Sequence, residues 1–325
     1  MEVYDKTKYL KLPIQEKLTN KIIFYLNIYE PMRGTSKLRG LQVYEKLLEH
    51  KQFDTIWIPS LHGHQFNEKL NMNIFDKVHD SIIFFIKYPV IPNAKELGMN
   101  ILKILKKNNN KLIYDFCDTN IETTHFMESI TYYDKIIFMS QLTKDIYSKK
   151  HKINEDKLVV IPHHYDSDID NYKNELKYDI INPVIYYFGG TSNLILSQEL
   201  KKLNVIMKNI YFIESKNDSI AHICFKKSNW PISTVKLGNC CALGSVPIIN
   251  DMSRENCYFD EKYPYILKKE DKESLQILIS KVKFDYLNNT SDFKLAIKYR
   301  DIIKKKISID SVIKLYIDLI SNLKT

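Results

Sequence analysis

Short apolar runs alternate with amphipathic or polar stretches along the first half of the chain. Runs of strand length lie at 21–26, 54–59, 81–87, 111–118, 134–139 and 158–162. Near-continuous apolar strands are typical of parallel sheets that are covered on both faces. Helical patterns occupy 37–50, 93–107 and 141–149, with Ser140 placed to cap the last of these helices. Alternating strands and helices predict an α/β fold with a parallel sheet.

The same alternation restarts after a polar stretch at 166–181, which lacks a periodic apolar pattern and is therefore interpreted as a linker. Beyond it, strands are expected at 184–188, 209–213, 221–226, 246–249 and 263–267, and helices at 235–243, 271–283, 290–305 and 308–323. We therefore predict two Rossmann-like domains, at 1–165 and 182–307, followed by a C-terminal helix at 308–325.

Composition describes a globular protein that favours anionic partners. The chain has 325 residues, of which 44% are hydrophobic and 27% charged, and this length is enough for two domains. Its net charge of +9 suits a nucleotide diphosphate, an anionic membrane surface or nucleic acid. Its five cysteines are odd in number and lack zinc spacing, which is typical of reduced thiols. With no apolar run of membrane-spanning length and no signal peptide pattern, we expect a cytoplasmic protein, compatible with peripheral membrane contact.

Glycine is scarce and clustered, and its positions indicate where a ligand could approach the backbone. Six of the eight glycines fall in three places, each near a predicted strand-to-helix transition. A phosphate or sugar can come close to the main chain at such a glycine. The pairs are Gly34 with Gly40, Gly189 with Gly190, and Gly238 with Gly244.

The first of these places is a loop after the first strand, at the edge where open α/β sheets bind ligands. Its candidates for binding a phosphate or the acceptor are Arg33, Gly34, Thr35, Ser36 and Arg39. Only four arginines occur in the chain, which suggests bidentate recognition by the two in this loop. The alternative is an ordinary capped helix start.

The third place lies within residues 230–251, where a loop, a short helix, a glycine turn and a buried strand follow one another. Gly244 can end the helix in the left-handed conformation. The helix N-terminus offers backbone N–H groups and a positive dipole end beside Thr234 and Lys236. This arrangement favours a phosphate site, although an ordinary αβ unit would show the same pattern.

Three segments resemble GT-B glycosyltransferases of the family 4 and family 1-like group. K-L-G-N-C-C-A-L-G-S-V-P-I-I-N-D at 236–251 resembles their donor-site pattern K-x-x-(E/N)-A-x-A-x-G-x-P-V-I. Y-D-K-I-I-F-M-S-Q-L-T-K-D resembles their a-D-x-I-I-x-x-S-x-x-T segment, and K-L-V-V-I-P-H-H-Y-D their V-I-P-N-G-V-D segment. The likeness spans about 21–283 as scattered motifs in a matching order.

The resemblance implies two Rossmann-like domains facing across a cleft and a sugar transferase that needs no metal. The second domain would hold the nucleotide-sugar, the first a glycan or lipid-linked acceptor, and the last helix would return to the first domain. The implied donor-binding residues are Gly189, Gly190, Thr191, Ser192, Thr234, Lys236, Asn239, Arg254 and Glu255.

A catalytic base is expected in the first domain, at a strand end or a cleft loop. The candidates are Asp118 and His64, with His62 and His163 also considered. Asp118 could equally cap a helix, and a loop histidine is often only polar surface.

Two further hypotheses remain beside a glycan-building transferase. One is a nucleic-acid-associated protein or a DNA-modifying glucosyltransferase, suggested by the positive charge. The other is a catalytically inactive GT-B scaffold, suggested by Asn239 where many relatives have glutamate. No H-E-x-x-H or C-x-x-C motif occurs, and the D-x-D spacing at 166–170 falls in the predicted linker, so no metal site is predicted.

Overall fold

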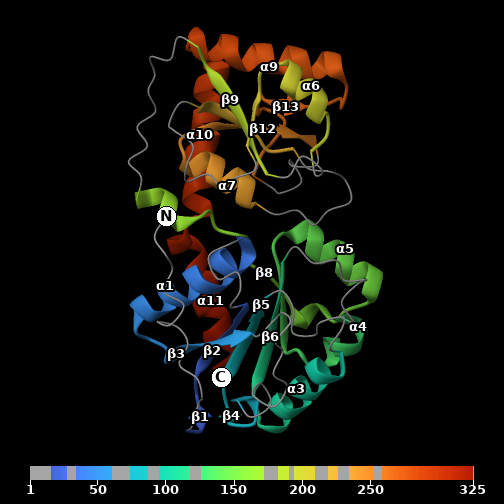
Figure 1. Cartoon of the computed structure of the whole chain (residues 1–325), viewed down its shortest axis with the longest axis vertical. Coiled ribbons are helices and arrows are strands. Elements are labelled where there is room, and N and C mark those ends of the chain that lie inside the picture. Colours follow the sequence, from blue (N-terminus) through green and yellow to red (C-terminus); the bar gives the residue numbers. More distant parts are fainter. Residues whose placement is uncertain are drawn as a thin grey trace. The chain divides into compact units, whose positions relative to one another are not determined.

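The computed structural model describes residues 16–27, 34–60, 74–86, 95–117, 126–171, 182–189, 194–208, 219–225, 234–251 and 258–324. The chain divides into two compact units (Figure 1). Unit 1 comprises Met1–Ile161 together with Ile313–Thr325, and unit 2 comprises Pro162–Val312. Unit 1 therefore ends shortly before the predicted boundary at 165 and takes in the end of the helix predicted at 308–325.

Unit 1 is built on a parallel sheet of six strands in the order β3-β2-β5-β6-β7-β8. The strands are β2 (Ile22–Asn27), β3 (Thr55–Ser60), β5 (Ile82–Ile86), β6 (Lys111–Phe116), β7 (Lys135–Phe138) and β8 (Leu158–Val160). A separate parallel pair joins β1 (Leu18–Thr19) to β4 (Val78–His79). The strand order reverses between β2 and β5, which creates a topological switch point.

The described helical segments of unit 1 include the three predicted helices and several short segments that were not predicted. They are η2 (a π-helix, Ser36–Leu41), α1 (Gln42–His50), α3 (Lys95–Lys107), α4 (Phe126–Ser129), α5 (Gln141–His151), and the short 3₁₀ segments η5 (Ile130–Tyr132) and η6 (Glu155–Lys157). Ser140 caps α5 as predicted, because its hydroxyl accepts a hydrogen bond from the Thr143 N–H at 3.1 Å.

The core of unit 1 is aromatic on both faces of its sheet. Phe24 stacks on Phe84 with ring centroids 4.9 Å apart, and Phe84 contacts Tyr316 of α11 (Ile309–Lys324). Neighbouring strand positions point to the opposite face, where the Tyr25 and Phe85 rings meet at 5.6 Å. Burial on both faces explains why these strands are apolar throughout.

Unit 2 is built on a second parallel sheet, of five strands in the order β10-β9-β11-β12-β13. The strands are β9 (Val184–Phe188), β10 (Ile206–Lys208), β11 (Ser219–Ile223), β12 (Val246–Asn250) and β13 (Ile266–Leu267). The order reverses between β9 and β11, so this sheet also has a switch point. The strand predicted at 209–213 lies outside the described residues, and β13 is shorter than predicted.

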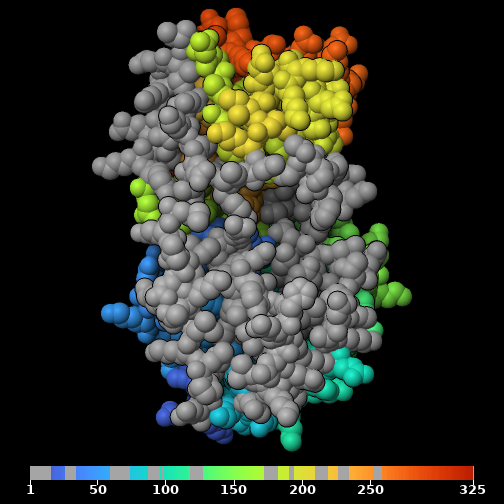
Figure 2. Space-filling model, viewed as in Figure 1, coloured from blue at the N-terminus to red at the C-terminus, as the bar shows by residue number. Residues whose placement is uncertain are grey.

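The described α-helices that lie wholly within unit 2 are α6 (Ser197–Lys202), α7 (Val235–Ala242), α9 (Lys272–Leu287) and α10 (Ser291–Lys306). Residues 194–208, which include α6 and β10, form part of the surface of this unit (Figure 2). The stretch predicted as a linker begins with a short 3₁₀ helix, η7 (Ser167–Asn171), within unit 2. Residues 172–181 lie outside the described part of the chain. None of the described helices combines the length and apolar character that crossing a membrane requires.

Candidate functional site

The best-defined candidate site lies in unit 2, where β9 ends and α7 begins. Gly189 directly follows β9, at the carboxyl end of a strand that borders the switch point. Lys236 lies in the first turn of α7. A Cβ added to Gly189 would lie 3.0 Å from the Lys236 Nζ, so the ammonium group rests against this glycine. The structure thus brings together two residues that the sequence predicted at the donor site.

Tyr187 holds the Lys236 side chain in this position. Its hydroxyl accepts a hydrogen bond from the Lys236 Nζ at 2.8 Å, and the same nitrogen lies 4.4 Å from the centre of the tyrosine ring. Burial raises the pKa of Tyr187 to about 12, with a further contribution from Cys224. The phenol is therefore neutral near pH 7 and can accept a hydrogen bond from the cation through its oxygen.

The glycine contributes space to this site rather than a donor group. The Gly189 N–H donates to the Lys208 carbonyl at 3.0 Å and so extends the pairing of β9 with β10. Gly189 has a φ of +125°, a conformation that other residues rarely adopt. Gly190, Thr191 and Ser192, predicted beside it, lie outside the described residues.

Two other predicted donor-binding residues fasten α7 to the segment before it. The Thr234 hydroxyl donates to the His163 carbonyl at 2.9 Å instead of capping its own helix. The Asn239 Oδ1 accepts from the Asp166 N–H at 2.8 Å. Both side chains are almost fully buried. The structure therefore shows an anchoring role for each, and donor binding by these two side chains stays a prediction.

In unit 1 the predicted anion-binding loop contributes an internal ion pair. The Arg39 Nε and Nη2 donate to the two carboxylate oxygens of Asp115, each at 2.9 Å, and Nη1 donates to the Ile161 carbonyl at 2.9 Å. The Tyr316 hydroxyl donates to Asp115 at 3.1 Å. Burial works to lower the pKa of Arg39, but the Asp115 carboxylate raises it above its ordinary value.

Arg39 thus makes the bidentate contact that the scarcity of arginine in this chain suggested, but its partner is a carboxylate of its own unit. Both side chains of the pair are fully buried. A phosphate could reach Arg39 only by breaking this pair, which would leave Asp115 buried without a counter-charge. The structure therefore favours a structural role for Arg39 over phosphate binding. Gly34 adopts a left-handed φ of 51°, and Thr35 and Ser36 are buried.

The candidate bases Asp118 and His64, the alternative His62, and the loop residues Arg33, Arg254 and Glu255 all lie outside the described residues. His163, the remaining alternative base, is fully buried, and its carbonyl accepts the bond from Thr234. Within the described ranges, no group of three or more His, Cys, Asp or Glu is arranged to hold a metal ion.

The sequence analysis did not identify Tyr187 or Asp115, although the sequence contains a signal for each. Alternation along a strand places Tyr187 on the same side as Gly189, two positions on. Asp115 is an acid inside an otherwise apolar run, and a buried acid requires a counter-charge. Both signals become informative only once the partner lysine or arginine is known.

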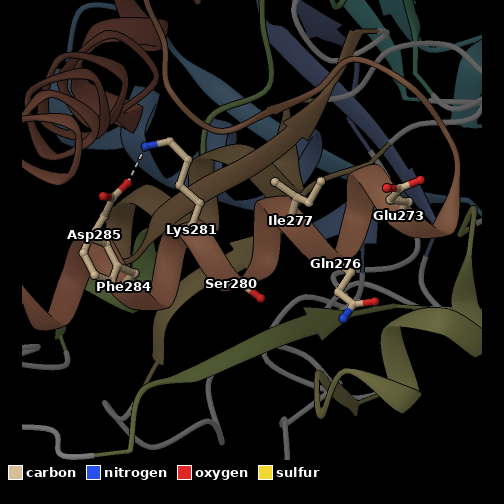
Figure 3. Close-up of a pocket in the computed structure, with 7 residues that line it drawn as sticks. All are labelled: Glu273, Gln276, Ile277, Ser280, Lys281, Phe284 and Asp285. Carbon is tan, nitrogen blue, oxygen red and sulfur yellow. Dashed lines mark hydrogen bonds and ion pairs between the residues drawn. The ribbon is translucent and has the colours of Figure 1, made fainter.

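A separate open groove is lined by residues of α9, between Glu273 and Asp285 (Figure 3). The Ile277 and Phe284 side chains there are each 62% exposed. Its Lys281 ammonium is engaged by Asp285 at 2.6 Å and by Asp292 at 2.5 Å. No residue that lines this groove was predicted to bind the donor, and its cation is already paired with carboxylates.

Two parallel sheets, each with a switch point, define an α/β fold of two Rossmann-like units, as predicted. Neither protein-family models nor curated proteins give a match to this sequence. Solved structures do match over nearly the whole chain. One is a glycosyltransferase from Rickettsia africae ESF-5, with 15% identity and a TM-score of 0.64, covering 93% of this chain and 97% of that chain.

Two further solved structures, both of glycosyltransferases, also match nearly the whole chain. An α-glucosyltransferase (AGT) in complex with UDP has 12% identity and a TM-score of 0.60, covering 93% of this chain and 99% of that chain. The lipopolysaccharide outer core galactosyltransferase WaaB in its apo form has 11% identity and a TM-score of 0.59, again covering 93% and 99%. At such identities the likeness shows the fold: this chain has the GT-B fold, as the motifs suggested.

Proposed function

We propose that this protein is a glycosyltransferase that moves a sugar from a nucleoside-diphosphate donor to a glycan or lipid-linked acceptor without a bound metal ion. The observation that carries the proposal is the Lys236 ammonium held against Gly189 at the switch point of the unit 2 sheet. A departing diphosphate must be stabilised by positive charge. Lys236 and the positive end of the α7 dipole would supply that charge at one place.

The remaining roles are assigned by the GT-B resemblance. Unit 2 would bind the donor, with Thr191, Ser192, Arg254 and Glu255 beside Lys236. Unit 1 would bind the acceptor near Arg33 to Ser36. Asp118, which follows the last described residue after β6, would act as the general base, and His64 is the second choice.

Thermal denaturation with UDP-, GDP-, CMP- and dTDP-sugars, in buffer containing EDTA, tests the donor site. A ligand that binds only the folded protein raises the melting temperature. We expect one nucleotide class to raise it and the Lys236→Ala variant to lose most of that rise. The matched control is Lys208→Ala, because Lys208 also lies over a tyrosine of β9, at 5.9 Å from the Tyr186 ring.

Two results would count against the proposal. Absence of any rise at millimolar nucleotide-sugar would remove the donor site. A rise in wild-type protein that depends on added divalent cation and disappears with EDTA would contradict the metal-free mechanism. Donor binding without release of nucleoside diphosphate, across a broad acceptor panel, would instead favour the catalytically inactive scaffold.

DNA is the second candidate acceptor, on two observations. One matching structure is an α-glucosyltransferase in complex with UDP-glucose and DNA containing an abasic site, with 12% identity and a TM-score of 0.58, covering 92% of this chain and 98% of that chain. The net charge of +9 also favours a polyanion. Transfer of labelled sugar to duplex DNA, but not to lipid-linked or free glycans, would establish this acceptor in place of the first.

A further inference from the structure

Tyr187 sits between the core of unit 2 and the candidate donor site, and it makes two distinct contacts with Lys236. The hydroxyl accepts from the Nζ at 2.8 Å, and the ring face lies 4.4 Å from the same nitrogen. The tyrosine is fully buried in β9, so its ring is fixed by packing. A lysine side chain has many rotamers, and these two contacts select one that points at Gly189.

We propose that Tyr187 is a positioning residue that holds the Lys236 ammonium ready for the diphosphate of the donor. The proposal rests on the proposed function and names the residue that prepares its cation. An ammonium group that is already oriented loses less conformational freedom when the ligand binds, so the diphosphate binds more tightly. The contacts that Tyr187 makes here are with the lysine, so its proposed role is exerted through Lys236.

The geometry around Gly189 gives this proposal a second, independent support. The Lys236 Nζ and Cε would lie 3.0 Å and 3.1 Å from a Cβ at position 189, and the Tyr187 hydroxyl 3.5 Å from it. A side chain there would crowd the end of Lys236, while the Tyr187 hydroxyl would remain at an ordinary contact distance. The space left by the absence of a Cβ at Gly189 and the contacts with Tyr187 therefore define the same position for the ammonium group.

β9 also contains a control for this arrangement. Tyr186 is the neighbouring residue, points to the opposite face of the sheet, and packs on Phe188 with ring centroids 5.4 Å apart. It too lies beneath a lysine, Lys208, at 5.9 Å. Tyr186 and Tyr187 are thus two buried tyrosines in one strand, each with a lysine over its ring, and of the two only Tyr187 contacts the lysine that rests against Gly189.

The test compares UDP and uridine affinity by calorimetry in wild-type, Tyr187→Phe and Tyr186→Phe proteins. Tyr187→Phe keeps the ring and removes the hydroxyl. We expect its UDP affinity to fall roughly three- to tenfold, as for loss of one hydrogen bond, with little change for uridine, which has no phosphate. Tyr187→Leu removes both contacts and should lose more. Tyr186→Phe should match wild-type protein.

A double variant separates positioning from general damage to the fold. If Tyr187 acts through the ammonium, Tyr187→Phe should have no further effect on UDP affinity in a Lys236→Ala protein. Equal losses in both backgrounds, or equal losses for UDP and uridine, would overturn the positioning role. An unchanged UDP affinity in Tyr187→Phe would overturn it while leaving the donor site intact. If wild-type protein binds another nucleotide class of the panel, the corresponding nucleotide and nucleoside replace UDP and uridine in this test. If it binds none of the nucleotide-sugars tested above, both proposals fail.

Discussion

At the scale of single residues, His222 of β11 is a buried imidazole enclosed by aromatic rings. Its ring centroid lies 5.0 Å from that of Phe188 and 6.2 Å from that of Tyr186, and the side chain is buried. Burial disfavours the charged form and lowers the pKa of His222 to about 3, from an ordinary value of 6.5. The folded protein therefore keeps this side chain neutral where an unfolded chain would protonate it.

This difference makes the stability of the protein depend on pH. The contribution of His222 is complete above pH 6.5 and is lost progressively as the pH falls from 6.5 towards 3. The expected slope is about 1.4 kcal/mol per pH unit, so roughly 2 kcal/mol is lost by pH 5. Urea denaturation at pH 7 and pH 5 measures it. The His222→Leu variant should lose about 2 kcal/mol less than wild-type protein over this interval. Equal losses in the two proteins would refute the assignment.

At the scale of elements, α7 depends on close packing at Gly238. A Cβ at this position would lie 2.8 Å from the Ile307 Cδ1 and 3.1 Å from the Tyr165 Cβ. Both neighbours are buried, so neither side chain can move into solvent. The glycine therefore allows α7 to approach the 163–166 segment and the end of α10.

Replacing this glycine should destabilise the protein in spite of the better helix propensity of alanine. Overpacking costs about 1–3 kcal/mol, and alanine recovers about 1 kcal/mol, so Gly238→Ala should lower the free energy of unfolding by roughly 1 kcal/mol. Chemical denaturation measures the change. Ile307→Val removes the Cδ1 that would clash, and it should cost less in the Gly238→Ala protein than in wild-type protein. Strictly additive effects would contradict the packing account.

The sequence predicted the helices and strands better than it predicted the contacts between them. The strands around Phe24 and Phe84 were found because burial on both faces leaves an apolar run, and α5 because Ser140 is a cap next to its helix. These signals are local in the chain. The Thr234–His163 and Arg39–Asp115 bonds join positions far apart in sequence, and no local pattern pairs them. The sequence therefore pointed to Gly189 and Lys236, which the structure brings together, but not to the groups that hold them, and donor binding by these residues stays a prediction.

At the scale of the whole molecule, unit 1 is formed by two stretches of sequence that are separated by unit 2. Residues 313–325 belong to unit 1, although unit 2 separates them from Ile161. This last segment buries Tyr316, Leu319 and Ile320 in unit 1, and the Tyr316 hydroxyl bonds to Asp115. The ion pair of Arg39 with Asp115 is therefore completed by residues at the opposite end of the sequence.

Truncation after Val312 should accordingly damage unit 1 while sparing the sheet of unit 2. Burial of each large apolar side chain contributes about 1.5–3 kcal/mol, so losing this segment removes roughly 5 kcal/mol or more, a large part of the stability of a domain. Hydrogen exchange read strand by strand measures the effect. We expect β5 and β6 to lose protection while β9, β11 and β12 keep most of theirs. A control truncation after Ile320 retains the buried apolar side chains of this segment and should leave both sheets protected. Equal loss of protection in the two sheets would show that the units unfold together, and retained protection in β5 and β6 would show that the segment contributes little to unit 1.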